Sequence, residues 1–362
     1  MKRILFIFAI MHTYSVYCIE VAFINPTKDD SPFWQRVNQV AISAANDLNI
    51  QLKIYNSGGH RLFQKQVINQ IIKQETKPDY IIFLPFDGTV QDTFTKLEQA
   101  NIPFITIEKT VFTDVNLDLG HPGGKFKFWL GAIYHDNKKA GQLLANSLFK
   151  ASNNNQPITD SFNVLGITGD FSGQSSDRNA GLITELEQQS RNFALAQIVN
   201  AHWERKLAAD KFNGLLKRYS NISIVWAAAD IMALGVVDIA EQQGKIINKD
   251  LFVGGFDWAI EALQAIKENR YTASVGGHFM QTAWALVKIY DHNNDKPVFI
   301  NGSKSPSFEL QLIDRNNIDN YQVLLNKPDW SKVDFRQFTL SHQADIADYQ
   351  FDFSRVLKKL NQ

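Results

Sequence analysis

Residues 21–56 read VAFINPTKDDSPFWQRVNQVAISAANDLNIQLKIYN and contain two apolar runs separated by an amphipathic stretch. The runs at 21–25 and 51–55 have the length and composition of buried β-strands. Residues 33–48, between them, repeat apolar side chains at helical spacing. The stretch therefore predicts a strand–helix–strand unit, in which two parallel strands are covered by the connecting helix.

The same alternation continues along the chain and divides it into two series. The first adds predicted strands at 80–84 and 104–107 and helices at 61–74 and 89–99. An irregular stretch follows at 108–128, with Pro122, Gly123 and Gly124. The second series has predicted strands at 130–133, 163–168, 194–200, 222–227, 251–256 and 273–276, and helices at 137–149, 177–189, 208–218, 230–243 and 259–269. The pattern predicts an α/β fold of two doubly wound parallel-sheet lobes.

The N-terminus has the pattern of an export signal. Lys2 and Arg3 precede an apolar run from Ile4 to Met11, and mixed residues follow up to Cys18. The run is far shorter than the ~20 residues that a membrane-spanning helix needs. We predict a signal peptide over residues 1–18, cleaved near Cys18. The alternative is a buried strand at 4–11, and bulky Tyr17 disfavours lipidation of the single cysteine.

Composition excludes several classes of protein. The chain has 362 residues, enough for two domains, with 37 basic and 37 acidic residues and a formal charge of zero. A balanced charge argues against general nucleic-acid binding, and no polybasic tract would recognise anionic membranes. The sequence lacks G-x-S-x-G, G-x-x-x-x-G-K-[ST], H-E-x-x-H and any cysteine cluster. We therefore expect no enzyme activity, metal or cofactor, although a glycoside hydrolase with two carboxylates remains an alternative.

Six motifs, mostly at strand ends, carry a resemblance to a known family. They lie between about Val21 and about Tyr321 and are, in order, Pro32-Phe33-Trp34, Ile102-Pro103 with Ile107-Glu108-Lys109, His135-Asp136-Asn137 with Ala140-Gly141, Ser176-Asp177-Arg178-Asn179-Ala180-Gly181, Trp226 to Gly235, and Val253-Gly254-Gly255-Phe256-Asp257. The chain resembles the periplasmic sugar-binding proteins of ABC transporters, of the ribose- and galactose-binding type, and the related autoinducer-2-binding receptors.

The resemblance implies a type I periplasmic binding protein, two lobes joined by a three-segment hinge. Crossovers are then expected near 108–130, 275–280 and 305–315. Lobe 1 would comprise residues 19–108 and 278–306, and lobe 2 residues 109–277 and 307–324. Residues 325–362 would form an aromatic C-terminal tail on the surface, ending in a short helix near 353–360.

The resemblance also implies a function. The protein would be a monomer in the periplasm that closes around a small sugar and presents it to an ABC permease. The alternative is a receptor subunit that signals to a membrane sensor kinase. A repressor of the same fold is disfavoured, because no helix-turn-helix pattern precedes the first strand. Departures from the family pattern at Ala229, at Glu108-Lys109 and at Gly276-Gly277-His278 put the identity of the sugar in doubt.

Aromatic candidates for the site are Phe33 and Trp34, which follow the first predicted strand, and Trp226, near the end of the predicted strand at 222–227. An aromatic ring suits the apolar C–H face of a sugar, while fixed polar groups suit its hydroxyl edge. The alternative for Phe33 and Trp34 is packing between helix and sheet, and for Trp226 a place in the core.

Polar candidates are Glu108, Asp136, Asp257, Arg178 and His278. A carboxylate accepts hydroxyl hydrogen bonds, and a guanidinium offers several planar donors. The two glycines before His278 would let a ligand approach the backbone. The alternatives are helix capping for the acids, a surface salt bridge for Arg178 and ordinary packing for His278. Asp230 is expected to cap the helix at 230–243.

Overall fold

Two β-sheets, one of five strands and one of six, organise the chain. The computed structural model describes residues 18–27, 31–108, 119–155, 162–170, 173–189, 193–219, 221–298, 307–343 and 348–362. The predicted signal peptide and Lys109 lie outside the described residues, apart from Cys18.

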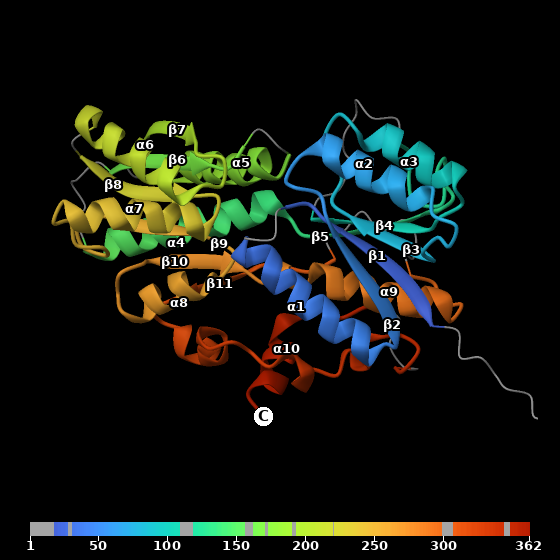
Figure 1. The fold of residues 1–362 in the computed structure, drawn as a ribbon. Coiled ribbons are helices and arrows are strands. Elements are labelled where there is room, and N and C mark those ends of the chain that lie inside the picture. The colour runs from blue at the N-terminus through green and yellow to red at the C-terminus, as the bar shows by residue number, and fades with distance from the viewer. Residues whose placement is uncertain are drawn as a thin grey trace, which may run out of the picture.

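The five-stranded sheet is parallel, with strand order β2-β1-β3-β4-β5. Its strands are β1 (Ile19–Asn25), β2 (Ile50–Asn56), β3 (Tyr80–Phe83), β4 (Phe104–Glu108) and β5 (Trp129–Tyr134). Four helices cover it: α1 (Pro32–Asp47), α2 (Arg61–Ile72), α3 (Val90–Gln99) and α9 (Gln281–Asn293). In Figure 1, α2 and α3 lie on one face of the sheet and α1 and α9 on the other. We call this unit the first lobe.

The residues of β1 show why the sheet is covered on both faces. Val21 and Phe23 belong to the core cluster shared with α1 and α9. Ala22 and Ile24 point the other way, into a second cluster with α2 and α3. A strand buried on both faces has a continuous apolar sequence rather than an alternating one, as the VAFIN run does.

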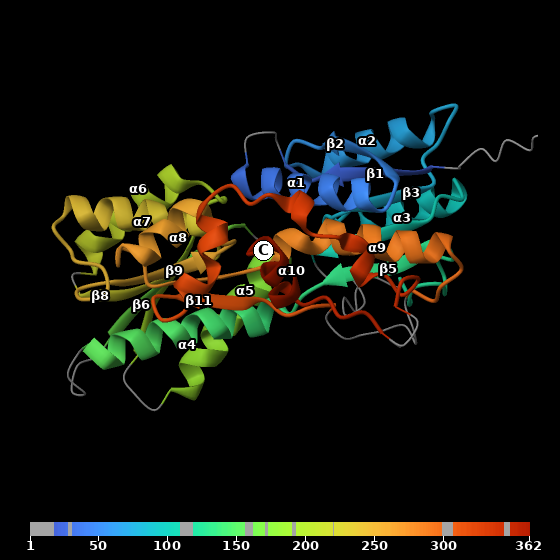
Figure 2. The same cartoon turned by 90° about the horizontal axis from the view of Figure 1, so that it is seen from below.

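The six-stranded sheet has the order β11-β10-β9-β8-β6-β7 and is parallel except for the edge strand β11. Its strands are β6 (Phe162–Thr168), β7 (Phe193–Asn200), β8 (Ile222–Ala227), β9 (Phe252–Phe256), β10 (Ala273–Gly276) and β11 (Gln311–Asp314). Its helices are α4 (Asn137–Asn155), α5 (Gly173–Gln188), α6 (Arg205–Arg218), α7 (Asp230–Gln242) and α8 (Ile260–Lys267). In Figure 2, α4 and α7 lie on opposite faces of this second lobe.

The strand pairing corrects one expected boundary. We expected the chain to enter the second lobe after residue 108, but β5 pairs with β4 in the first sheet. Trp129 explains the placement, because its fully buried ring packs against Phe94 in the cluster beneath α3. The first crossing therefore lies between Tyr134 and Asn137.

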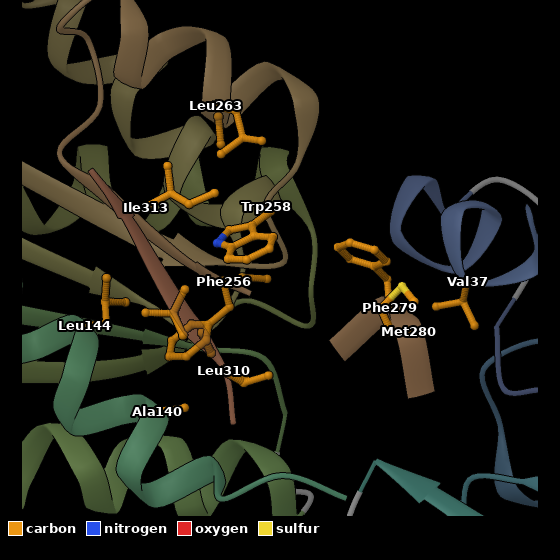
Figure 3. Packing of buried hydrophobic residues seen from close by; sticks show 14 of the residues in the cluster. Val37, Ala140, Leu144, Phe256, Trp258, Leu263, Phe279, Met280, Leu310 and Ile313 are labelled. Atoms are coloured by element: carbon orange, nitrogen blue, oxygen red, sulfur yellow. The ribbon is translucent and has the colours of Figure 1, made fainter. Parts of the chain in front are cut away.

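Two further segments connect the lobes. After β10, the short helix η1 (His278–Met280) leads into α9, which returns to the first lobe. Between α9 and β11 the chain crosses again, and Ser307 donates its backbone N–H to Tyr134 O at 2.8 Å. Figure 3 shows Phe279 and Met280 between Trp258 of the second lobe and Val37 on α1. One apolar core thus runs through the connection between the lobes.

The C-terminal tail (residues 325–362) begins at the last residue of the 3₁₀ helix η3 (Ile318–Leu325). Its described elements are η4 (Trp330–Lys332), η5 (Phe335–Phe338) and α10 (Phe353–Leu360). The tail runs beneath both lobes in Figure 1, and its final helix agrees with the predicted one.

Candidate functional site

A buried polar cluster forms where the carboxyl ends of the two sheets meet. Glu108 ends β4 of the first lobe, while Asp257 and His278 follow β9 and β10 of the second. Arg178 reaches the cluster from α5, and Phe33 from the start of α1. Ligands of open parallel sheets bind at this end of the strands. Five sequence-predicted residues therefore come together where a ligand site is expected.

Arg178 links the two lobes. Its Nη2 donates to Glu108 Oε1 at 3.4 Å, its Nε to Asn137 Oδ1 at 2.9 Å and its Nη1 to Ala228 O at 2.8 Å. The guanidinium also lies 4.5 Å from the ring centre of Phe256. The residue is 3% exposed, so the alternative of a surface salt bridge does not describe it. With five N–H donors in all, Arg178 keeps donors for a further partner.

Two glycines explain how Arg178 reaches Asn137. A Cβ on Gly181 of α5 would lie 2.2 Å from Lys138 O, and one on Gly141 of α4 would lie 2.2 Å from Arg178 O. Helices α4 and α5 therefore cross with their backbones in contact. This close crossing brings the first residue of α4 beside the guanidinium on α5.

His135 is a site residue that the sequence analysis missed, and it connects the two halves of the cluster. Its Nε2 lies 3.1 Å from Asn137 Oδ1 and 3.9 Å from Glu108 Oε1. Its ring centre is 5.1 Å from that of His278. Burial lowers the pKa of His135 well below 6.5, and the neighbouring His278 and Arg178 lower it further. His135 directly follows β5 and precedes Asp136, and this strand-end position is the feature of the sequence that could have identified it.

His278 joins the second-lobe acid to the aromatic residues of α1. Its Nε2 lies 3.1 Å from Asp257 Oδ1, and its ring centre is 4.6 Å from that of Phe33. Trp34 meets Phe33 edge to face at 5.3 Å. Phe33 and Trp34 are both half-buried, so each keeps part of its ring surface accessible. His278 is 1% exposed.

Three buried atoms of the cluster have no hydrogen-bond partner among the described residues: Glu108 Oε2, His135 Nδ1 and His278 Nδ1. Asn137 Oδ1 already accepts from Arg178, so neutral His135 carries its proton on Nε2 and a lone pair on Nδ1. His278 faces Asp257 through Nε2, which leaves Nδ1 as the nitrogen open to a ligand. Glu108 Oε2 and His135 Nδ1 are therefore acceptors. Buried polar groups require partners, so the cluster is suited to a ligand that donates hydrogen bonds.

The backbone of the cluster is strained at two of its acids. Glu108 has φ of 76° and Asp257 has φ of 103°, a region that residues with a side chain rarely adopt. Such conformations cost about 1–3 kcal/mol each and gather at ligand sites. Their occurrence at the two strand ends supports a binding role for both carboxylates.

Two predicted site residues, Asp136 and Trp226, lie outside the cluster. Each has the structural role given as its alternative, a helix cap for Asp136 and a place in the core for Trp226. Asp136 is exposed, and its Oδ1 accepts from the N–H of Lys139 at 2.8 Å, as a helix cap does. Trp226 is fully buried beneath Gly141, to whose carbonyl its Nε1 donates at 3.2 Å. It supports α4 from the core, so the expectation that it stacks on a ligand is wrong.

Asp230 also differs from expectation. Its carboxylate does not cap α7, where no side-chain cap is formed. It instead accepts from Ser274 Oγ, Tyr271 Oη and the N–H of Ala259 at 2.8–2.9 Å. Burial raises its pKa well above 3.8, and Asp257 raises it further. Asp230 therefore holds β10 and the start of α8 in place behind Asp257.

Trp203 is another residue at the carboxyl edge of the second sheet that the sequence analysis did not select. It follows β7, is half-buried, and has φ of 62°. Its indole lies on Gly169, past the end of β6, where a Cβ would be 2.1 Å from the ring. Only glycine at 169 leaves room for this ring.

Two cavities are lined by none of the polar-cluster residues. One of about 130 Å³ adjoins the Arg205–Asp238 ion pair, and one of about 600 Å³ lies between α4 and residues 308–310. The cluster itself is closed, since Glu108, Arg178 and His278 are all buried. The polar chemistry of the cluster and its position at the strand ends, rather than an open cavity, identify it as the candidate site.

Neither a metal centre nor a membrane span emerges from the described part of the chain. Within it, no three His, Cys, Asp or Glu side chains are placed to hold one ion. No described helix combines the length and apolar character needed to cross a bilayer.

Comparisons with known proteins agree with this architecture. A solved periplasmic sugar-binding protein from Pseudomonas fluorescens is similar with a TM-score of 0.82 at 24% identity, over 95% of this chain and 99% of that one. A periplasmic solute-binding protein of an ABC transporter from Actinobacillus succinogenes 130z, solved with bound D-allose, has a TM-score of 0.72 at 21% identity, over 84% and 100%. These likenesses show the type I periplasmic binding fold.

Sequence comparison extends the agreement. The D-allose-binding periplasmic protein of Escherichia coli (strain K12) is 23% identical over 286 residues, which cover 77% of this chain and 86% of that protein. The model of the periplasmic binding protein domain matches residues 21–293, three quarters of the chain and both lobes. The chain therefore belongs to the periplasmic binding protein domain family.

Proposed function

We propose that this protein captures a small neutral sugar between its lobes and delivers it to an ABC importer. The observation that carries the proposal is the set of three buried atoms without a partner among the described residues, Glu108 Oε2, His135 Nδ1 and His278 Nδ1, of which the first two are acceptors. A sugar presents several hydroxyl groups, each of which donates one hydrogen bond and accepts others. Arg178 has N–H groups beyond the three that donate to described residues, and these can donate to the oxygens of the same hydroxyls.

The charge pattern favours a neutral ligand over an anionic one. An ionised phosphate or carboxylate group offers acceptors, which would face the lone pairs of Glu108 Oε2 and His135 Nδ1. Phe33 and Trp34 add apolar ring surface beside this polar edge, as the C–H face of a sugar requires. A binding role without catalysis is consistent with a solute-binding family.

Import is favoured over signalling to a sensor kinase, because relatives in the family are named as import binding proteins. Delivery from the periplasm requires export, for which the N-terminal pattern supports cleavage near Cys18. Permease and ATPase genes beside this gene would support import, whereas a sensor-kinase gene in their place would support the receptor function.

A thermal-shift screen followed by calorimetry tests the proposal. The panel should hold neutral aldoses, ketoses and polyols, with matched sugar acids, sugar phosphates and amino acids. We expect a neutral sugar to raise Tm, since a ligand that binds only the folded state stabilises it. Its acid and phosphate should bind at least ~100-fold more weakly, about 2.7 kcal/mol. Binding of amino acids alone, or of the anions in preference, would refute the proposal.

A further inference from the structure

The turn that presents Asp257 is strained and needs support. Asp257 and Trp258 have φ of 103° and 53°, so two successive residues with side chains have positive φ. The turn is held by the N–H of Asp257 on Val275 O at 2.9 Å and the N–H of Trp258 on Ser274 Oγ at 3.3 Å. Strained conformations persist only where their surroundings over-determine them. The place of the Asp257 carboxylate therefore depends on how firmly Trp258 is held.

Trp258 is packed on several sides. On one side its indole lies on Gly276, where a Cβ would be 2.5 Å from the ring. On other sides the indole packs against the rings of Tyr321 and Phe353, each with its ring centre 5.3 Å away. Phe353 also packs edge to face on Phe279 of the inter-lobe connection, at 5.5 Å. Phe353 belongs to the C-terminal tail, so the tail completes the packing around the turn.

The tail is anchored to the first lobe before it reaches the turn. Ser43 Oγ of α1 donates to Trp330 O at 2.9 Å, and Asp47 Oδ2 accepts from the N–H of Phe335 at 2.8 Å. On α9, fully buried Asp291 accepts from the N–H groups of Leu340 and Ser341 at 2.7 and 2.9 Å. Figure 1 shows α10 beneath the junction of the two lobes. The tail therefore connects first-lobe helices to a second-lobe turn.

We propose that the C-terminal tail is part of the binding machinery, and that Phe353 is a positioning residue for Asp257. By filling the space behind Trp258, Phe353 keeps the strained turn in the conformation that directs the carboxylate to His278. The tail thus acts on the site without touching the ligand. The ligand-dependent part of this inference rests on the proposed function.

The chain supplies a matched control in Phe351. Phe351 and Phe353 are two residues apart and are 7% and 6% exposed. Phe351 stacks on Trp284 of α9 at 4.7 Å, and no ring contact joins it to Trp258 among the described residues. Phe351→Ala and Phe353→Ala therefore remove the same buried group from the same tail, but only the second removes support from the turn.

The first measurement is hydrogen exchange of the Asp257 and Trp258 amides in the ligand-free protein. Phe353→Ala should speed this exchange about tenfold or more through local opening of the turn, and Phe351→Ala should leave it within about twofold of wild type. Phe353→Leu keeps apolar contact with Trp258 and should retain most of the wild-type protection of the two amides. This variant keeps the proposal testable if Phe353→Ala fails to fold. Equal exchange in the two alanine variants would overturn the proposal.

The second measurement is the affinity for the sugar identified by the thermal-shift screen. Phe353→Ala should raise Kd about tenfold, with Phe353→Leu in between, while Phe351→Ala changes Kd less than about twofold. Faster exchange without weaker binding would also overturn the proposal. If wild type binds no sugar, the proposed function fails, and the exchange measurement alone decides whether the tail holds the turn.

Discussion

Arg178 combines charge, geometry and position in a way that lysine cannot reproduce. Its three hydrogen bonds to described residues run to a first-lobe acid, an amide on α4 and a strand-end carbonyl. A guanidinium makes such divergent bonds from one rigid plane, whereas an ammonium is a point donor. Glu108, one of the departures from the family pattern, accepts from the guanidinium at 3.4 Å.

Arg178→Lys should therefore weaken sugar binding about tenfold or more and lower the free energy of unfolding by about 1–3 kcal/mol, because buried acceptors lose their donors. Calorimetry and urea denaturation measure the two effects. Arg205→Lys is the control, since Arg205 forms a partly exposed ion pair with Asp238 at 2.8 Å and should cost less than about 1 kcal/mol. Equal losses in the two variants would contradict a special role for Arg178.

His135 makes stability depend on pH in a defined direction. Its pKa is lowered in the folded protein, while the unfolded chain takes up a proton near 6.5. Below about pH 6.5 the unfolded state binds more protons, so the free energy of unfolding should fall as the pH falls. Protonation would also convert its acceptor Nδ1 into a donor.

His135→Phe removes this titration, so wild type should lose stability more steeply than the variant between pH 7.5 and about 5.5. Urea denaturation at several pH values gives the comparison, and all other histidines are shared by the two proteins. Parallel plots of the free energy of unfolding against pH for the two proteins would contradict the prediction, because they would mean that His135 has the same pKa in the folded and unfolded states.

Among the elements, the α4–α5 pair sets the geometry of the site. Gly141 and Gly181 allow the two backbones to touch, and that contact brings Asn137 to Arg178. The A-G and S-x-R-x-x-G patterns thus combine the buried Arg178 with the glycines that allow its placement.

Gly181→Ala should force α4 and α5 apart, because its Cβ would lie 2.2 Å from Lys138 O. We expect a loss of about 2–4 kcal/mol in stability and weaker sugar binding, as over-packing does in a close-packed core. Gly214→Ala on α6 is the control, since nothing lies within 4 Å of its Cβ. It should be neutral or stabilising by up to about 1 kcal/mol, through its helix propensity.

For the molecule as a whole, the Glu108–Arg178 pair joins the lobes across the site. A second inter-lobe bond runs from the N–H of Gly173 to Asp87 Oδ2 at 3.4 Å. Contacts of this kind exist only while the lobes are together, so a ligand that bridges them should favour the closed state.

Spin labels can measure that closure. Gln91 on α3 and Lys217 on α6 are exposed and lie in different lobes. With both changed to cysteine in a Cys18→Ser background, the distance between labels should shorten or narrow in distribution when sugar is added. A pair at Glu75 and Gln91, within the first lobe, should not change. An unchanged inter-lobe distance would contradict ligand-driven closure.

The sequence by itself determined the parallel α/β architecture and the strand ends that carry the candidate site residues. Runs such as VAFIN encode strands buried on both faces, and helical spacing encodes the covering helices, because both depend on nearby residues. Phe33, Glu108, Arg178, Asp257 and His278 could be selected for the same reason, since each lies at or near a strand end or in a local motif.

Only the tertiary structure decided which of these residues meet. An apolar run such as β5 does not specify its partner strand, so the first crossing was placed too early. Asp136 and Trp226 have the local pattern of site residues, yet one caps α4 from the surface and the other supports it from the core. His135 lies beside Glu108 and Asn137, and Phe353 of the tail packs on Trp258, through contacts between distant parts of the chain. The physical reason is that the environment of a strand-end side chain is set by packing between elements, which local spacing does not record.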